Sequence, residues 1–215
     1  MYEFEAIFAL ALLFIIIYFV GSRQNKKLSV KYAKAIKEHM KPHSEFVGFR
    51  AYGRSGFRSL CQLKNEKAFS RIEIAVALVD RENLMHYPLS LLTKEYDRLV
   101  CWCFLKNTIP SDTEILPKGD KKLHKRIVSQ GKLKEITFTE SELSDSFTFL
   151  AANVDFAKRF LSDSNVQRSL REAKNFVKRL SLSQHNSWVH LIAELKDESL
   201  KPLLNLVLSC GKALT

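Results

Sequence analysis

The sequence predicts an α+β protein in which one N-terminal transmembrane helix precedes a domain with a mixed, mostly antiparallel sheet and helices on one face. Three observations predict this class. An apolar run without charge fills residues 6–20, and short segments with alternating side chains dominate residues 45–106. After residue 120, patterns typical of helices and of strands follow each other along the chain.

The apolar run at the N-terminus is long enough to cross a membrane. With Gly21 and the aromatic residues that precede it, the run reaches about 20 residues, which spans a hydrocarbon core of ~30 Å as a helix. A cleaved secretory signal is the alternative. Such a signal begins with positive residues, whereas Glu3 and Glu5 open this chain without any Lys or Arg. We therefore predict an uncleaved transmembrane anchor at residues 1–22.

A basic segment follows the anchor and sets its direction. Residues 23–42 contain many Lys and Arg residues, and Glu38 is their acidic exception. By the positive-inside rule, the N-terminus then lies outside and the rest of the chain lies on the cytosolic side. The cations expected at the membrane surface are Arg23, Lys26, Lys27, Lys31 and Lys34.

Residues 23–42 also predict a juxtamembrane basic amphipathic helix that continues the anchor and stops before Pro42. Its apolar stripe is expected to pack on the domain, while its lysines face lipid headgroups or an anionic partner. The stripe consists of Leu28, Tyr32, Ala35, Ile36 and Met40.

Residues 43–215 form the predicted cytosolic α+β domain. Its first half reads as a hairpin and two further strands, with a short helical piece around residues 88–93 and a loop at residues 107–119. The loop holds two prolines and is the candidate sub-boundary of the domain. The predicted strands are 45–52, 57–64, 71–80 and 96–106, and the hairpin turn is 53–56.

The second half of the domain alternates helices and strands. A basic helix ends at Gly131, and a Leu-rich C-terminal helix is apolar nearly all round, which favours burial in the core over contact with a partner. The predicted helices are 120–130, 155–163, 165–180 and 199–214, and the predicted strands are 133–139, 146–153 and 188–195.

The sequence offers no catalytic or metal-binding constellation, so we expect neither an enzyme nor a cofactor. A Gly-rich phosphate loop, an H-x-x-x-H pair, a Cys-x-x-Cys pair and a nucleophile elbow are all missing. His185 and His190 flank a turn, which a plain hairpin explains. The acidic run around Glu140, Glu142 and Asp145 is expected to be a solvated connection. The cysteines, expected to be buried and reduced, are Cys61, Cys101, Cys103 and Cys210.

The net charge of +11 favours anionic partners. Two predicted helices, at 120–130 and 165–180, each combine an apolar stripe with a basic face. Such faces suit phosphate backbones recognised by charge, although a solvated helix surface is the alternative for either helix alone. The candidate ribosome-facing residues are Lys121, Lys122, Lys125, Arg126, Arg168, Arg171, Lys174 and Lys178.

One family resemblance covers the order of these features over residues 10–214. The segment YFVGSRQNKKLSVKYAKAIKEHM resembles the membrane exit and following helix of the calumin family, the coiled-coil-domain subunit of the PAT complex. The segment ESLKPLLNLVLSCGKAL is similar to the Leu-rich helix of that family. Residue matches between the two segments are sparse. The closest match lies at Gly21, Arg23, Gln24, Asn25 and Leu28.

The resemblance implies a non-enzymatic, single-pass protein of the endoplasmic reticulum, or of the plasma membrane in an archaeon. Its domain would lie beside the Sec translocon and the ribosome. With membrane lipid around it and a small Asterix-like membrane protein as partner, it would act as an intramembrane chaperone for nascent multipass membrane proteins. The residues expected to meet that small partner are Ala9, Leu12, Leu13 and Ile16.

The sequence departs from the family at both ends. It lacks the acidic lumenal region, so calcium buffering is not carried over, and the family's C-terminal coiled coil does not follow Thr215. Ribosome contact is therefore expected to use the basic faces of the domain. The alternatives are a membrane-anchored enzyme and a lipid-binding tether on the cytosolic face.

Overall fold

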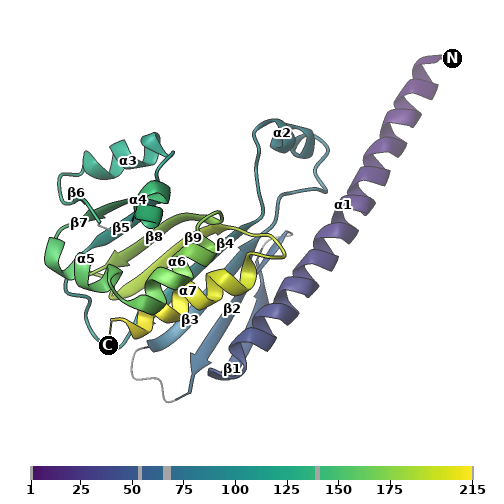
Figure 1. Ribbon diagram of the computed structural model, residues 1–215. Coiled ribbons are helices and arrows are strands. Elements are labelled where there is room, and N and C mark those ends of the chain that lie inside the picture. The colour runs from purple at the N-terminus through teal and green to yellow at the C-terminus, as the bar shows by residue number, and fades with distance from the viewer. Residues whose placement is uncertain (1, 53–54, 65–68, 139–140, 215) are drawn as a thin grey trace.

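The computed structural model describes residues 2–52, 55–64, 69–138 and 141–214, which form a long N-terminal helix and one antiparallel sheet with further helices (Figure 1). The strands are β1 (Ser44–Ala51), β2 (Gly56–Leu63), β3 (Phe69–Ala77), β4 (Arg98–Leu105), β5 (Thr113–Pro117), β6 (Lys134–Ile136), β7 (Phe147–Ala151), β8 (Val177–Ser183) and β9 (Trp188–Glu194). The helices are α1 (Tyr2–Met40), α2 (His86–Leu92), α3 (Lys121–Val128), α4 (Ser141–Ser146), α5 (Val154–Leu161), α6 (Ser164–Ala173) and α7 (Leu200–Lys212).

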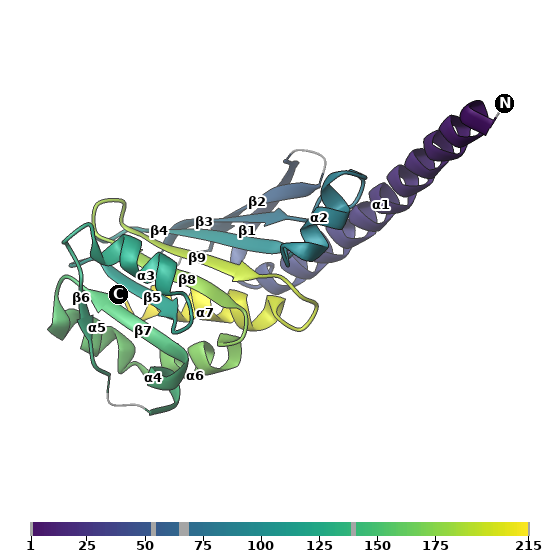
Figure 2. The same cartoon turned by 90° about the horizontal axis from the view of Figure 1, so that it is seen from above.

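α1 runs without a break from the apolar residues into the domain, and its N-terminal half projects away from the sheet (Figure 2). By length and composition it is able to cross a membrane. Its C-terminal half packs on β1, β2 and α7. Tyr32, Ile36 and Met40 are buried there, as the stripe predicts. The predicted end before Pro42 is also confirmed.

The strand order across the sheet is β1-β2-β3-β4-β9-β8-β5-β7-β6. The first four strands form a meander, and β8 and β9 form a hairpin in the middle of the sheet. Every pairing among the described strands is antiparallel. The predicted fold class, α+β with a mostly antiparallel sheet behind an apolar helix, is confirmed.

One face of the sheet carries the main core. α5, α6 and α7 lie across this face, and a row of apolar side chains runs along it through Ile74, Cys101, Leu191, Leu180, Ile115 and Phe149. The opposite face has a second, smaller cluster under α3, formed by Leu116, Ile127 and Leu150. Adjacent residues of a strand point to opposite faces of the sheet, so Ile115 belongs to the main core and Leu116 to the smaller cluster.

α7 is a core helix, which confirms the interpretation of its apolar surface. Leu203, Leu204 and Val207 are buried against the sheet and α6. A side chain at Gly211 would overlap the ring of Phe69, so the helix and the start of β3 are in close contact. The four cysteines are buried and free, as predicted, namely Cys61, Cys101, Cys103 and Cys210. Burial raises the pKa of each of these thiols.

Two predicted elements are wrong. The helix predicted at residues 165–180 ends at Ala173, and β8 begins at Val177. Apolar residues continue at helical spacing through the turn between α6 and β8, so the sequence pattern does not show where the helix ends and the strand begins. The loop predicted at residues 107–119 contains β5, a short strand in the middle of the sheet. Its two prolines and polar residues favoured a loop. In the folded chain Glu114 is buried in the strand, because Arg179 and Ser181 donate hydrogen bonds to its carboxylate.

Two smaller predictions concern short connecting segments. Part of the acidic run expected to be a connection is helix α4, while Glu140 lies outside the described residues. In the predicted hairpin turn, Gly53 and Arg54 likewise lie outside them. The basic helix predicted to run to residue 130 and to be capped by Gly131 ends earlier, at Val128, and Ser129 is its C-cap. Gly131 lies in the turn that follows, with a positive φ of 73°.

Candidate membrane-docking site

The structure brings α1 against the segment that connects β3 to β4 at the point where the apolar run ends. Gly21 touches the backbone of this connection, and a side chain at Gly21 would overlap the carbonyl oxygen of Arg81. Glycine therefore permits a contact between the helix and the connection that any other residue would prevent.

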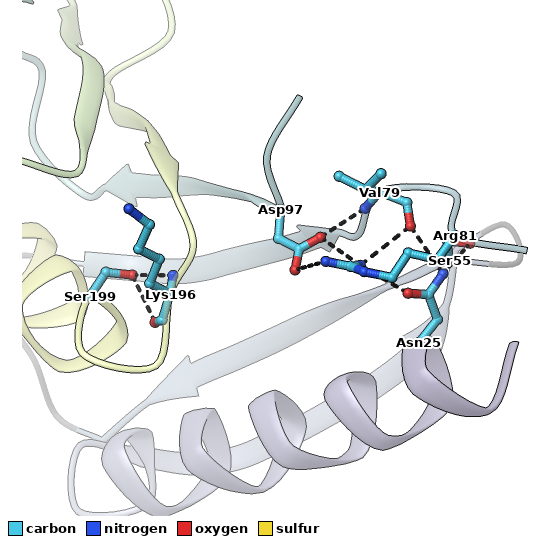
Figure 3. Close-up of polar contacts among 7 residues, drawn as sticks. All are labelled: Asn25, Ser55, Val79, Arg81, Asp97, Lys196 and Ser199. Carbon is cyan, nitrogen blue, oxygen red and sulfur yellow. Dashed lines mark hydrogen bonds and ion pairs between the residues drawn. The ribbon is translucent and has the colours of Figure 1, made fainter. Parts of the chain in front are cut away.

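A polar network, the α1 clamp, lies beside this contact (Figure 3). The Asp97 carboxylate accepts hydrogen bonds from both terminal nitrogens of Arg81, each at 2.9 Å, and from the Val79 N–H at 2.8 Å. Arg81 also donates to Asn25 Oδ1 at 3.0 Å. The Asn25 side chain donates to the Val79 carbonyl at 3.0 Å and to Ser55 Oγ at 3.1 Å.

The α1 clamp is buried, which makes it strong and also intolerant of a missing partner. Asn25 is 2% exposed and Asp97 is 8% exposed. A two-pronged arginine–carboxylate pair fixes the direction of both side chains as well as their separation. Because Asn25 belongs to α1 and Asp97 immediately precedes β4, the network sets the angle at which α1 leaves the sheet.

Further along α1, a second set of contacts holds its C-terminal half. Lys31 forms an ion pair with Asp197 at 2.5 Å. Tyr32 is buried beside it, and burial, with a smaller effect of the Asp197 and Asp97 charges, raises the pKa of its phenol to about 12. The phenol thus stays neutral, and α1 is attached to the domain over several turns.

The predicted juxtamembrane cations divide into two groups along α1. At about 1.5 Å of rise per residue, Arg23, Lys26 and Lys27 lie within ~9 Å of Gly21 along the axis. Lys31 and Lys34 lie ~15 and ~20 Å from Gly21 on the same basis, farther than the ~8 Å over which salt screens charge. All five side chains are exposed. The first three are therefore the ones that suit headgroup contact, whereas Lys31 helps to dock the helix.

The four residues predicted to meet a membrane partner are exposed on the projecting half of α1, namely Ala9, Leu12, Leu13 and Ile16. Ile16 additionally lines a hollow of about 300 Å³ between α1 and the β3–β4 connection. Leu84, Tyr87 and Pro88 form the other wall of this hollow.

The eight candidate ribosome-facing residues do not form one surface. The four on α3 are exposed and make no ion pair with any described residue. On α6, Arg168 donates to Asn165 and Arg171 pairs with Glu142. Lys174, just after the end of α6, also pairs with Glu142. Lys178 lies on β8 and pairs with Glu194 at 2.9 Å, so its placement on a basic helix is wrong. α3 and α6 also cover opposite faces of the sheet.

His185 and His190, which flank a turn in the sequence, do not line the same hollow. His190 lines a hollow of about 310 Å³ on the open sheet face, together with Trp188, Arg179 and Glu114. His185 does not line it, and Glu194 is engaged by Lys178 and Lys196. Burial and, secondarily, the Arg179 charge lower the pKa of His190 to about 4.

The α1 clamp was not predicted, although the sequence contains one signal of it. Gly21 and Asn25 continue the apolar stripe of α1 toward the N-terminus at helical spacing. A glycine and an amide on a stripe that packs against a domain indicate a close backbone contact and a buried hydrogen bond there. Arg81 and Asp97 gave no comparable signal.

Comparisons with known proteins show distant structural likeness. Neither a protein-family model nor a curated protein matches the chain. Among solved structures, the crystal structure of the mycobacterial trehalose monomycolate transport factor A, TtfA, is similar at a TM-score of 0.49 and 11% sequence identity. The match covers 86% of this chain and 96% of that one. A likeness of this size says nothing of function.

Proposed function

We propose that this chain is a single-pass membrane protein whose domain lies on the cytosolic side and serves as a non-enzymatic scaffold for the insertion and folding of multipass membrane proteins. The membrane is the endoplasmic reticulum in a eukaryote and the plasma membrane in an archaeon. The observation that carries the proposal is the continuous α1, held to the domain by Asn25, Arg81 and Asp97.

A rigid α1 suits a scaffold better than it suits a simple tether. A tether needs only length, which a flexible linker supplies at little cost in specific sequence. Here the helix continues through the membrane exit, and a close contact at Gly21 and an ion pair at Lys31 add to the α1 clamp. Such a helix keeps an intramembrane surface in a fixed orientation to the domain.

The proposed partners follow the two exposed surfaces. The apolar stripe of Ala9, Leu12, Leu13 and Ile16 takes membrane lipid and a small Asterix-like membrane protein. α3 supplies contact with the ribosome, because its cations are not engaged within the described part of the chain. With these contacts, the proposed position of the protein is beside the Sec translocon and nascent multipass chains. The resemblance to the calumin family is the argument for these particular partners.

Site-specific photocrosslinking tests the proposal. A photoreactive residue at Ala9 or Leu12 of the full chain in native membranes is expected to crosslink to a small membrane protein. The same residue at Phe4, near the end of the exposed run, is the matched control for contact with bulk lipid. Crosslinks to lipid alone from Ala9 and Leu12 would contradict the scaffold and favour a lipid-binding tether.

A further inference from the structure

The connection between β3 and β4 contains helix α2, which has no role in the proposed scaffold function. It carries α2 away from the sheet on the side of α1, toward the projecting half of that helix (Figure 1, Figure 2). Leu84, Tyr87 and Pro88 share a hollow with Ile16 and Val20. α2 therefore lies beside the last turns of the apolar run, whereas Val79 and Arg81 at the start of the connection contact Asn25 just after that run.

The outer surface of α2 and its preceding residue is apolar and has no partner among the described residues. Four large side chains are exposed by half or more of their surface, namely Met85, Leu89, Leu91 and Leu92. So many exposed apolar side chains on so short a helix are atypical of a water-exposed element and mark an interaction site.

The depth of α1 decides what covers this surface. If the apolar run ends at Gly21, Ile16 lies ~7 Å inside the hydrocarbon, since a helix rises about 1.5 Å per residue. The wall formed by Leu84 and Tyr87 meets Ile16 at that level. α2 thus lies at the level of the leaflet on the side of the domain, in the part nearest the headgroups, where lipid would surround it.

Charged residues limit how far the connection enters. Asp80 and Glu82 line a second hollow with Phe14 and Tyr18. An ionised carboxylate is costly in the hydrocarbon core and is tolerated in the hydrated headgroup layer. The connection must therefore lie at the boundary between headgroups and acyl chains, which makes ~7 Å the greatest depth that Ile16 can have. The same boundary suits Tyr18 and Tyr87 as interfacial aromatic residues.

We infer that α2 inserts into the leaflet on the side of the domain, with Met85, Leu89, Leu91 and Leu92 in contact with lipid. The inference rests on the transmembrane placement of α1 in the proposed function and adds a second membrane contact to it. One helix leaves a domain free to rotate about the helix axis. Two contacts joined by the α1 clamp fix that rotation, so a single face of the domain is presented to partners.

Depth-dependent fluorescence quenching tests the inference on the purified full chain in phosphatidylcholine vesicles. An environment-sensitive fluorophore is attached at Leu91→Cys, and the four native cysteines do not compete because they are buried. Leu12→Cys on α1 and Lys122→Cys on α3 are the matched positions. Nitroxide lipids carry the quencher near the headgroup or near the acyl terminus.

We expect a blue-shifted emission at residue 91 and at least a twofold stronger quenching by the shallow nitroxide than by the deep one. Residue 122 should show neither effect. Quenching at residue 12 with none at residue 91 overturns the inference and leaves the anchor intact. Absence of quenching at residue 12 overturns the transmembrane placement itself. A blue shift at residue 91 without quenching indicates contact with a second copy and overturns the inference.

Discussion

Asp97 is the residue on which the junction between α1 and the sheet depends most. Replacing it by alanine removes three hydrogen bonds and leaves the largely buried Arg81 charge without its charged partner. Removing one partner of a buried ion pair costs about 3–5 kcal/mol. We expect Asp97→Ala to lower the free energy of unfolding by that amount, measured by urea denaturation of the full chain in mild detergent.

The pair formed by Arg71 and Glu73 is the control for Asp97. Its two charged groups are 2.8 Å apart, but its side chains are 48% and 31% exposed, against 15% and 8% for Arg81 and Asp97. Exposed pairs contribute about 1 kcal/mol or less, because water screens them. Glu73→Ala should therefore have a small effect. Equal losses in the two variants would contradict the assignment of Asp97 to a buried clamp.

His190 is expected to make stability depend on pH. Its pKa in the folded protein is about 4, whereas an unfolded histidine titrates at about 6.5. The unfolded chain therefore binds this proton first as the pH falls. The contribution of neutral His190 is fully present above pH ~6.5 and is lost as the pH falls toward about 4.

The variant His190→Phe isolates this effect, since a phenyl ring is able to keep the stacking on Trp102 that the imidazole makes at 5.5 Å. We expect a shallower loss of unfolding free energy between pH 6.5 and 4 in the variant, measured by denaturant titration at each pH. His39, whose pKa burial also lowers, remains in both proteins. Identical pH slopes would contradict a role for His190.

At the scale of elements, local patterns predicted α1, α7 and the first four strands because each has a strong period of its own. Local patterns gave a wrong prediction between α6 and β8, because residues 166, 170, 173, 177 and 180 keep a helical spacing where the helix ends and the strand begins. What decides the change is the pairing of β8 with β9 and β5. Strand pairing between segments distant in sequence does not affect the spacing of apolar residues within one segment, so that spacing does not predict it.

The candidate site shows the same limit more sharply. Arg81 and Asn25 are 56 residues apart, and Ser55 reaches Asn25 across 30 residues. Each is an ordinary polar residue in its own segment, and only the fold makes them neighbours. The apolar run and the cations after it were predictable because membrane length and charge bias act on contiguous residues.

α3 is the element on which the ribosome contact is expected to depend. Its exposed Lys121, Lys122 and Lys125 are not engaged by described residues, whereas on α6 Glu142 partly neutralises Arg171. Reversing these three charges should weaken co-sedimentation of the full protein with translating ribosomes several-fold at physiological salt, because charge contacts to phosphate dominate such binding.

The matched control for α3 is charge reversal at Arg168, an exposed cation on the opposite face of the sheet. It should leave co-sedimentation nearly unchanged. If the α3 variant sediments with ribosomes as the unchanged protein does, the ribosome is not a partner through this helix. A loss in the Arg168 variant alone would move the contact to α6.

For the whole molecule, the proposal depends on α1 holding an intramembrane surface in a fixed orientation to the domain. Inserting alanines between Phe14 and Ile15 changes that orientation without touching the α1 clamp. An α-helix turns about 100° per residue, so two alanines rotate Ala9 and Leu12 by about 200° and four rotate them by about 40°. Both insertions lie in the exposed half of the helix and should leave the unfolding free energy of the domain unchanged.

If one partner meets both the stripe and the domain, crosslinking from Ala9 should fall strongly with two inserted alanines and persist with four. The shorter insertion disturbs the membrane span less than the longer one, so a greater loss with two alanines reflects rotation and not added length. Equal crosslinking in both variants would mean that the stripe acts independently of the domain. α1 would then be a tether, and the α1 clamp would serve the stability of the junction alone.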